Sequence, residues 1–252
     1  AGSIIAILAA VLGYFVILKQ LNFTAHALSH IGFAGACGAE LIGCSLLFGQ
    51  LSITILAAMI IVIMGERLKQ NNNMTSIVLT FCLGLGSLFL YLTNHFSVSA
   101  HRILFGDLFS TQPHDVLIIA YLSLGCLLVL SFIARPLWFS ALLPDLAMSR
   151  GIRVRLLDFI FFLALAVGIT LISQIVGILL IFTLLIGPPA LAVKFAQNFW
   201  SSIFLCIGFN CGILYLSITL SLKTNWPLSF WISALVLIAY IMSYFLKILA
   251  KE

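Results

Sequence analysis

Charged residues are scarce in this sequence. Of its 252 residues, 8% are Asp, Glu, Lys or Arg and 63% are hydrophobic, whereas a typical soluble domain carries about 25% charge. So few charges cannot cover a water-facing surface of ordinary polarity. The composition therefore excludes a soluble domain and indicates a polytopic membrane protein.

Several motifs that would assign a soluble activity are also missing. No GxxxxGK[ST] occurs, so the chain does not bind ATP through a P-loop. The 12 Lys and Arg residues form no basic run, which argues against a nucleic-acid partner. The cysteines have no CxxC spacing, and we interpret them as reduced packing residues. They are Cys37, Cys44, Cys82, Cys126, Cys206 and Cys211.

Long uncharged runs separate the few charges. A helix needs about 20 apolar residues to span a membrane, and these runs lack the alternation of β-barrel strands. We therefore expect an all-α fold with eight or nine transmembrane helices in a single membrane domain over 1–252. The first run carries no cleavage site after it, so we expect a first span whose leading residues are missing rather than a signal peptide. The uncharged runs are 1–18, 20–39, 41–65, 70–101, 116–134, 159–193, 195–222 and 224–246.

Clusters of basic residues indicate which loops face the cytoplasm. One cluster lies at 66–69 and the other within 135–155. With both inside, the segment 93–114 lies outside and 136–156 forms a cytoplasmic loop. The predicted early spans that satisfy this alternation lie near 1–18, 24–46, 50–65, 74–92 and 115–134.

The number of crossings after residue 157 stays open. The uncharged stretch 159–193 is interrupted by Gly187, Pro188 and Pro189. It could be one long span followed by a short broken helix, or two tight crossings. Two crossings would place Lys247 and Lys251 inside.

The second run carries the ionisable groups that invite a functional interpretation, because such groups are costly inside a membrane. At 100° per residue, His26, His30, Cys37 and Glu40 share one helical face. The opposite face carries Gly32, Gly35, Gly38 and Ala39, which would let another helix approach closely.

Two interpretations of this polar face remain open. The histidines could simply form hydrogen bonds to neighbouring helices. Alternatively, because His26 and His30 are four residues apart, both imidazoles could face one divalent ion such as zinc. Two ligands bind weakly, as a transport path requires. The string HALSH lacks the glutamate of HExxH, which disfavours a zinc protease.

Two further segments are polar. The first, on the predicted outer side, is either a solvated loop or an outer metal vestibule; it contains His95, His101, Asp107, His114 and Asp115. The second, 143–152, has a proline start, a short helical run and a glycine stop, the pattern of an ordinary cytoplasmic turn.

Four segments together resemble the integral-membrane permeases of the zinc/manganese ABC importers (ABC-3 type), and in particular their high-affinity zinc-uptake branch. LGYFVILKQLNFTAHALSHIGFAG resembles a family segment that contains G-D-x-L-[SA]-H. ILFGDLFSTQPHDV resembles LFGDLL-x-x-x-P-x-D-L, and LPDLAMSRGI resembles D-P-E-x-A-x-x-x-G-[IV]. SQIVGILLIFTLLIGPPALAVKFA resembles VG-x-L-L-[IV]-x-x-L-L-I-x-P-A-A-x-A-R.

The resemblance implies a homodimeric permease in the bacterial cytoplasmic (inner) membrane, with zinc as its transported substrate and no permanently bound cofactor. Its implied partners are two copies of a separate ATPase, a periplasmic or lipid-anchored metal-binding protein, and membrane lipid. The ATPase would dock at the 143–152 coupling loop, through Pro144, Asp145, Ala147, Arg150 and Gly151.

The first of these segments departs from the family pattern at two neighbouring positions, where Ala25-His26 replaces Gly-Asp. The family's Asp and His fall on His26 and His30, so a histidine stands where the family has an aspartate. Loss of an oxygen ligand and gain of a nitrogen favours zinc over manganese. Asp107 and Asp115 match family aspartates, whereas His95, His101 and Glu40 match nothing in these motifs.

Three alternatives stay open beside a zinc importer. Manganese or iron is the nearest competing substrate within the same family. A stand-alone ion-coupled transporter would need its own coupling acids near the midplane, for which only Glu40 is available. A haem-binding enzyme would need histidines on facing helices, which are not evident.

Overall fold

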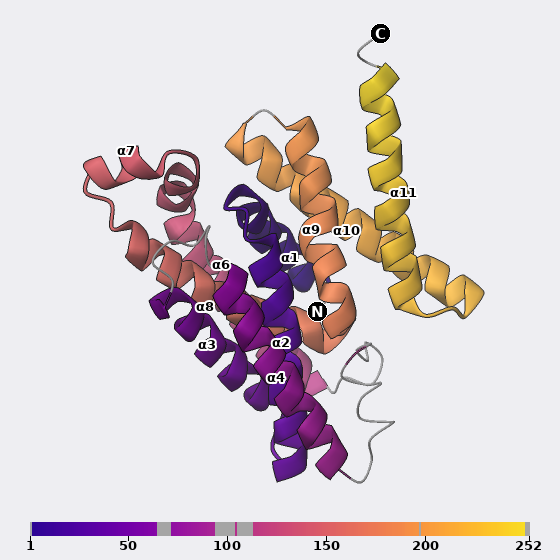
Figure 1. Cartoon of the computed structure of the whole chain (residues 1–252). Coiled ribbons are helices and arrows are strands. Elements are labelled where there is room, and N and C mark those ends of the chain that lie inside the picture. The colour runs from indigo at the N-terminus through magenta and orange to yellow at the C-terminus, as the bar shows by residue number, and fades with distance from the viewer. Residues whose placement is uncertain (1, 65–71, 94–103, 105–112, 197, 250–252) are drawn as a thin grey trace.

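The computed structural model describes residues 2–64, 72–93, 104, 113–196 and 198–249, and this part of the chain is helical with no strand (Figure 1). The all-α prediction is confirmed for these residues. The helices are α1 (Gly2–Leu18), α2 (Asn22–Ile42), α3 (Leu46–Met64), α4 (Asn72–Leu92), α6 (Pro113–Leu142), α7 (Pro144–Ser149), α8 (Val154–Val176), α9 (Ile178–Phe195), α10 (Phe199–Thr224) and α11 (Leu228–Leu249).

Seven of the described helices are long and apolar enough to cross a membrane: α3, α4, α6, α8, α9, α10 and α11. The predicted count of eight or nine is not confirmed. The two remaining long helices, which would raise the count from seven to nine, are the first two in the chain. Helix α1 is apolar but only 17 residues long, and α2 is long enough but carries His26, His30 and Glu40.

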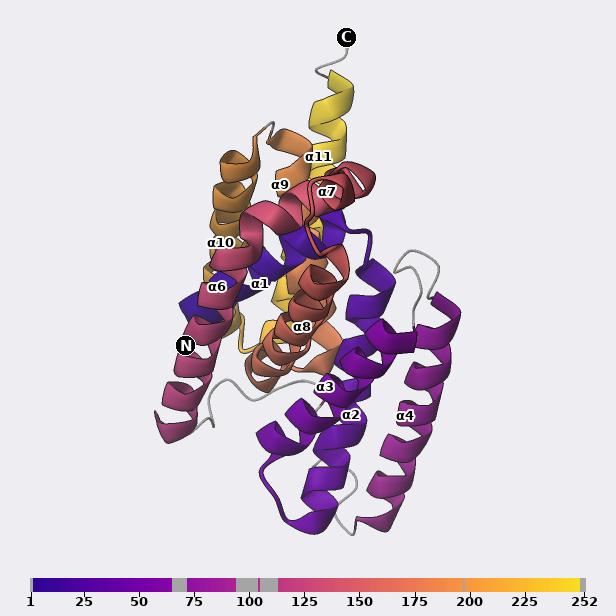
Figure 2. The same ribbon diagram turned by 90° about the vertical axis from the view of Figure 1, so that its left-hand side faces the viewer.

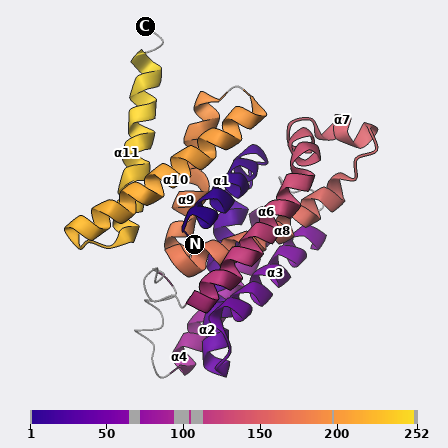
Figure 3. The same cartoon turned by 180° about the vertical axis from the view of Figure 1, so that it is seen from behind.

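Helix α1 is the centre of the apolar core. Its residues Ile5, Leu8, Leu12 and Phe15 are at most 1% exposed, and it packs against α6, α8, α9 and α10. Helix α11 packs against α9 and α10 at the edge of the bundle, as Figures 1 and 3 show. Because α1 packs against four helices, its position depends on several neighbours at once.

The stretch 159–193 forms two successive helices, but the predicted point of interruption is wrong. The break lies at Gly177, between α8 and α9, with φ 87° and ψ 156°. This backbone region is open almost only to glycine. Pro188 and Pro189 instead lie inside α9.

The prolines inside α9 lie at a close contact with α1. Proline has no N–H, so Pro189 leaves the carbonyl of Leu185, four residues earlier, without its usual donor. Helix α1 approaches that carbonyl through Gly13, where an added Cβ would overlap the Leu185 oxygen and lie 2.7 Å from Pro189 Cγ. The two backbones therefore touch where the helix lacks a hydrogen bond.

Helix α2 packs against α3 and α4, and Figure 2 shows the three helices grouped together. A Cβ on Gly35 would overlap the Gly49 carbonyl oxygen, and one on Gly49 would overlap the Gly35 oxygen and Ala39 Cβ. On the α4 side, Gly86 lies against the Phe33 ring. The predicted small-residue face of α2 is thus confirmed as a face that allows close packing.

The predicted loop 136–156 is largely helical, which corrects its boundaries. Helix α6 continues through Pro136 to Leu142 rather than ending near residue 134. Helix α7 then starts with Pro144 at its first turn and is followed by Gly151 at φ +78°, as the proline start and glycine stop predicted. Figures 1 and 2 show α7, the last turn of α9, the first turn of α10 and the last turn of α11 at the same end of the bundle.

We expect Gly35→Ala to destabilise the protein because its new methyl group overlaps the α3 backbone. Overpacking of this kind costs about 1–3 kcal/mol, and each kcal/mol lowers Tm by about 2–4 °C in a chain of this size. Thermal unfolding in detergent measures it. The control is Gly125→Ala, since a Cβ there meets nothing within 4 Å. Equal Tm values for the two variants would contradict the proposed α2–α3 contact.

Candidate functional site

The histidines of α2 lie side by side, one helical turn apart. The ring centroids of His26 and His30 are 4.5 Å apart with an interplanar angle of 84°. The His26 ring also meets Phe182 of α9 edge-on, with 4.7 Å between centroids. Both imidazoles are half-buried. The shared face predicted for the two histidines is confirmed, and it is turned toward α9.

One ring nitrogen of His26 makes no hydrogen bond to a neighbouring helix among the described residues. Its Nδ1 atom is buried and has no hydrogen-bond partner. The nearby Ser29 hydroxyl donates instead to the His26 backbone carbonyl, at 2.7 Å. Imidazole nitrogen binds zinc at about 2.0–2.1 Å, so rings this close can share one ion. The ligand role of the pair stays a prediction, with one unpartnered imidazole nitrogen beside a second imidazole.

The two other residues of the predicted face do not complete a metal site with the histidines. No group of three or more His, Cys, Asp or Glu side chains in the described ranges could hold one ion. Cys37 is 1% exposed and is packed among apolar residues that include Leu90 and Ile178. Glu40 is half-buried in the last turn of α2. Of the four residues on the predicted face, His26 and His30 are the two whose rings are in contact.

The structure describes only part of the segment that contains the predicted outer residues. His95, His101 and Asp107 lie outside the described residues. His114 and Asp115 belong to the first turn of α6, but their side chains are not among those described. The outer vestibule remains a prediction.

Helix α7 docks on α6 through the predicted coupling residues. Ala147 is fully buried, and its carbonyl accepts the Ile152 N–H at 3.1 Å. The Arg150 guanidinium lies 5.6 Å from the centroid of the Phe139 ring in α6. Leu146 and Met148 are 45% and 57% exposed. The docked helix therefore leaves an apolar edge open at its end of the bundle.

A buried polar ladder between α3 and α8 was not anticipated from the sequence. Gln50 Nε2 donates to Ser173 Oγ, and Gln174 Nε2 donates to Gln50 Oε1, both at 2.7 Å. One turn away, the hydroxyls of Thr54 and Thr170 are 2.9 Å apart. The available signal was the four-residue spacing of Gln50 with Thr54 and of Thr170 with Gln174 inside apolar runs.

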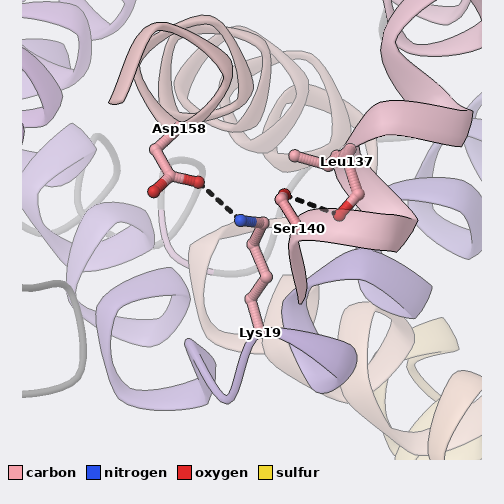
Figure 4. Close-up of polar contacts among 4 residues, drawn as sticks. All are labelled: Lys19, Leu137, Ser140 and Asp158. Carbon is pink, nitrogen blue, oxygen red and sulfur yellow. Dashed lines mark hydrogen bonds and ion pairs between the residues drawn. The ribbon is translucent and has the colours of Figure 1, made fainter. Parts of the chain in front are cut away.

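The ion pair between Lys19, which directly follows α1, and Asp158 of α8 was also not anticipated from the sequence. Lys19 Nζ lies 2.5 Å from Asp158 Oδ1, beside Ser140 and Leu137 of α6 (Figure 4). Its sequence signal was weak. These two residues are single charges that border the uncharged runs 1–18 and 159–193.

A family model supplies the assignment that geometry alone does not. The model described as the ABC 3 transport family matches residues 1–247. The chain belongs to the ABC 3 transport family. Family membership confirms the expectation of a membrane permease of the ABC metal importers.

Some relatives are named for manganese import and others for zinc uptake. The manganese import system permease protein ScaB of Streptococcus parasanguinis is 28% identical over 222 residues, 87% of this chain and 79% of that protein. The high-affinity zinc uptake system membrane protein ZnuB of Buchnera aphidicola subsp. Schizaphis graminum is 30% identical over 222 residues, 87% of this chain and 83% of that protein. The names of the relatives therefore do not decide between zinc and manganese.

A solved structure supports the fold. PsaBC from Streptococcus pneumoniae in complex with a Fab matches with a TM-score of 0.85 and 24% identity, covering 96% of this chain and 88% of that one. At this identity the likeness establishes the arrangement of helices.

We expect the purified protein to bind zinc through the His26–His30 pair. In a calorimetric titration in detergent, His26→Ala/His30→Ala should weaken binding at least about tenfold, or about 1.4 kcal/mol. Binding should also weaken as pH falls, because protons compete for imidazole nitrogen. Cys126→Ala, at a buried cysteine of α6, is the control and should bind like wild type. Unchanged binding by the double variant would exclude the pair as ligands.

Proposed function

We propose that this chain is the permease subunit of an ATP-binding cassette importer that moves zinc across the bacterial cytoplasmic membrane. The observation that carries the proposal is the adjacent His26–His30 pair with its unpartnered nitrogen. The chain is a transport subunit, and the ATP is hydrolysed by two copies of a partner chain. A periplasmic or lipid-anchored protein delivers the metal, and the permease works as a homodimer.

The donor set supports zinc as the substrate. Imidazole nitrogen suits zinc, whereas manganese prefers carboxylate and other oxygen ligands. His26 stands at the position where the resembled motif has an aspartate. In a twofold dimer, two such pairs facing the axis would supply up to four nitrogens. Manganese is the second candidate because relatives named for manganese import match this chain as well.

The metal would pass α2 through a site that is occupied only transiently. A path needs a site favourable enough to enter and weak enough to leave, and two nitrogens per chain meet this requirement. ATP can drive uptake only if the outward and inward states differ in their affinity for the metal. The contact between His26 and Phe182 gives α9 a direct means of covering or uncovering the imidazoles.

Substituting His26 should change the preferred metal. In proteoliposomes with the ATPase and the metal-binding protein, we expect wild type to take up radioactive zinc in preference to manganese. His26→Asp should shift this ratio toward manganese by about tenfold, or about 1.4 kcal/mol, because a carboxylate replaces a nitrogen. His26→Asn, of similar size but without the charge, is the control and should lower uptake of both ions.

Two results of the same assay would count against the proposal. Uptake by wild type without ATP would refute the importer assignment. Manganese uptake that equals or exceeds zinc uptake by wild type would keep the importer and remove zinc as its substrate.

Helix α7 should be the docking site of the ATPase. Met148→Glu places a charge on its exposed apolar edge, and we expect about tenfold less ATPase to co-purify with the permease. The control Asn225→Asp adds the same charge at the exposed turn between α10 and α11, and it should leave recovery unchanged. Zinc binding by the isolated permease should be unaffected in both. Equal ATPase recovery in the two variants would place the docking surface elsewhere.

A further inference from the structure

The Lys19–Asp158 ion pair is buried where two helices meet. The side chains are only 7% and 14% exposed, and their charged atoms are 2.5 Å apart. Figure 4 shows the pair beside α6, where the Ser140 hydroxyl donates to the Leu137 carbonyl at 3.0 Å. A buried ion pair is weak evidence for stability, because desolvation offsets the attraction. We therefore consider which parts of the bundle the Lys19–Asp158 pair connects.

On the lysine side, the pair lies at the hydrogen-bonded turn between α1 and α2, the helix that carries the histidines. The N–H groups of Lys19, Gln20 and Leu21 donate to carbonyls of the last turn of α1. Gln20 adopts φ 58°, and Leu21 is 3% exposed in the core. Helix α2 follows at once, so His26 lies about 6 Å along it. A displacement of Lys19 is therefore passed to α2 rather than absorbed by a loop.

On the aspartate side, the pair reaches the α7 end of the bundle. Asp158 is the fifth residue of α8. The link from α7 to α8 is short and hydrogen-bonded: Gly151 N–H donates to Met148 O, and Val154 N–H donates to Ile152 O. A movement of α7 would therefore reach Asp158 through few free torsions.

We propose that Lys19 and Asp158 are positioning residues that couple movement of α7 to the histidine pair of α2. The proposal rests on the function given above, in which α7 receives the ATPase. The ion pair resists separation of the two segments, because its attraction weakens as the distance between the charges grows. It can also separate and re-form in a second state without repacking an apolar surface.

The test replaces the charges while keeping the volume. Lys19→Met/Asp158→Leu removes both charges, and apolar replacement of a buried pair is often neutral for stability. The charge-swapped Lys19→Asp/Asp158→Lys restores the attraction. Each variant is assembled with its ATPase and metal-binding protein in proteoliposomes, and zinc ions imported per ATP hydrolysed are measured beside Tm and zinc binding by the permease alone.

We expect the apolar variant to keep its Tm, its zinc binding and its ATP hydrolysis. Its zinc imported per ATP should fall about tenfold, within the usual size of coupling between sites, and the swapped variant should recover part of it. A wild-type ratio in the apolar variant would overturn the proposal, because the pair would then be structural only.

Two further outcomes keep the test decisive. If the apolar variant does not fold, Lys19→Arg keeps the charge but alters its geometry; a lowered ratio with normal Tm supports coupling, and a wild-type ratio overturns it. If the wild-type assembly imports no metal in an ATP-dependent way, the proposed function itself fails. That result differs from normal import by wild type and the apolar variant alike, which would overturn only the role of the ion pair.

Discussion

The contact of Gly35 with Gly49 holds α2, and with it the histidine face, in place against α3. Burial of apolar surface contributes little to helix association in lipid, so close backbone approach and interhelical hydrogen bonds must supply the specificity. Gly35 and Gly49 allow α2 and α3 to meet at their backbones. Next to them, a Cβ on Gly32 would lie 2.9 Å from Gln50 Nε2, the amide that donates to Ser173 of α8. Helix α2 is thus tied to α3 and, through α3, to α8, while its imidazoles face away toward α9.

Helices α1 and α9 also meet at their backbones, at Gly13 of α1 and beside the prolines of α9. Pro189 removes a hydrogen bond from α9, a loss that membrane helices can tolerate. Gly13 brings α1 against the released Leu185 carbonyl. The prolines therefore mark a helix–helix contact rather than a helix end. The break lies at Gly177 instead, because the chain turns there with a backbone conformation that only glycine readily adopts.

These examples show what the sequence could and could not predict. Charge spacing was enough for the all-α fold, and 100° per residue was enough to bring His26 and His30 together. Helical periodicity gives the direction of a side chain but not the partner that covers it. Cys37 is buried, as expected of a packing residue, but its partners Leu90 and Ile178 were not foreseen. The pairing of Lys19 with Asp158 joins residues 139 positions apart, and no local pattern encodes such a contact.

The two kinds of contact around α2 differ in how freely they can move. Backbone contacts such as that of Gly35 with Gly49 cannot slide without steric overlap, since the neighbouring atoms leave no free volume. The edge-on contact of His26 with Phe182 involves only side chains, which can change rotamer. Rearrangement during transport is therefore easier between α2 and α9 than between α2 and α3. The Lys19–Asp158 pair joins α1, which packs on α9, to α8, which packs on α3. It lies between the part of the bundle that holds the histidines and the part that covers them.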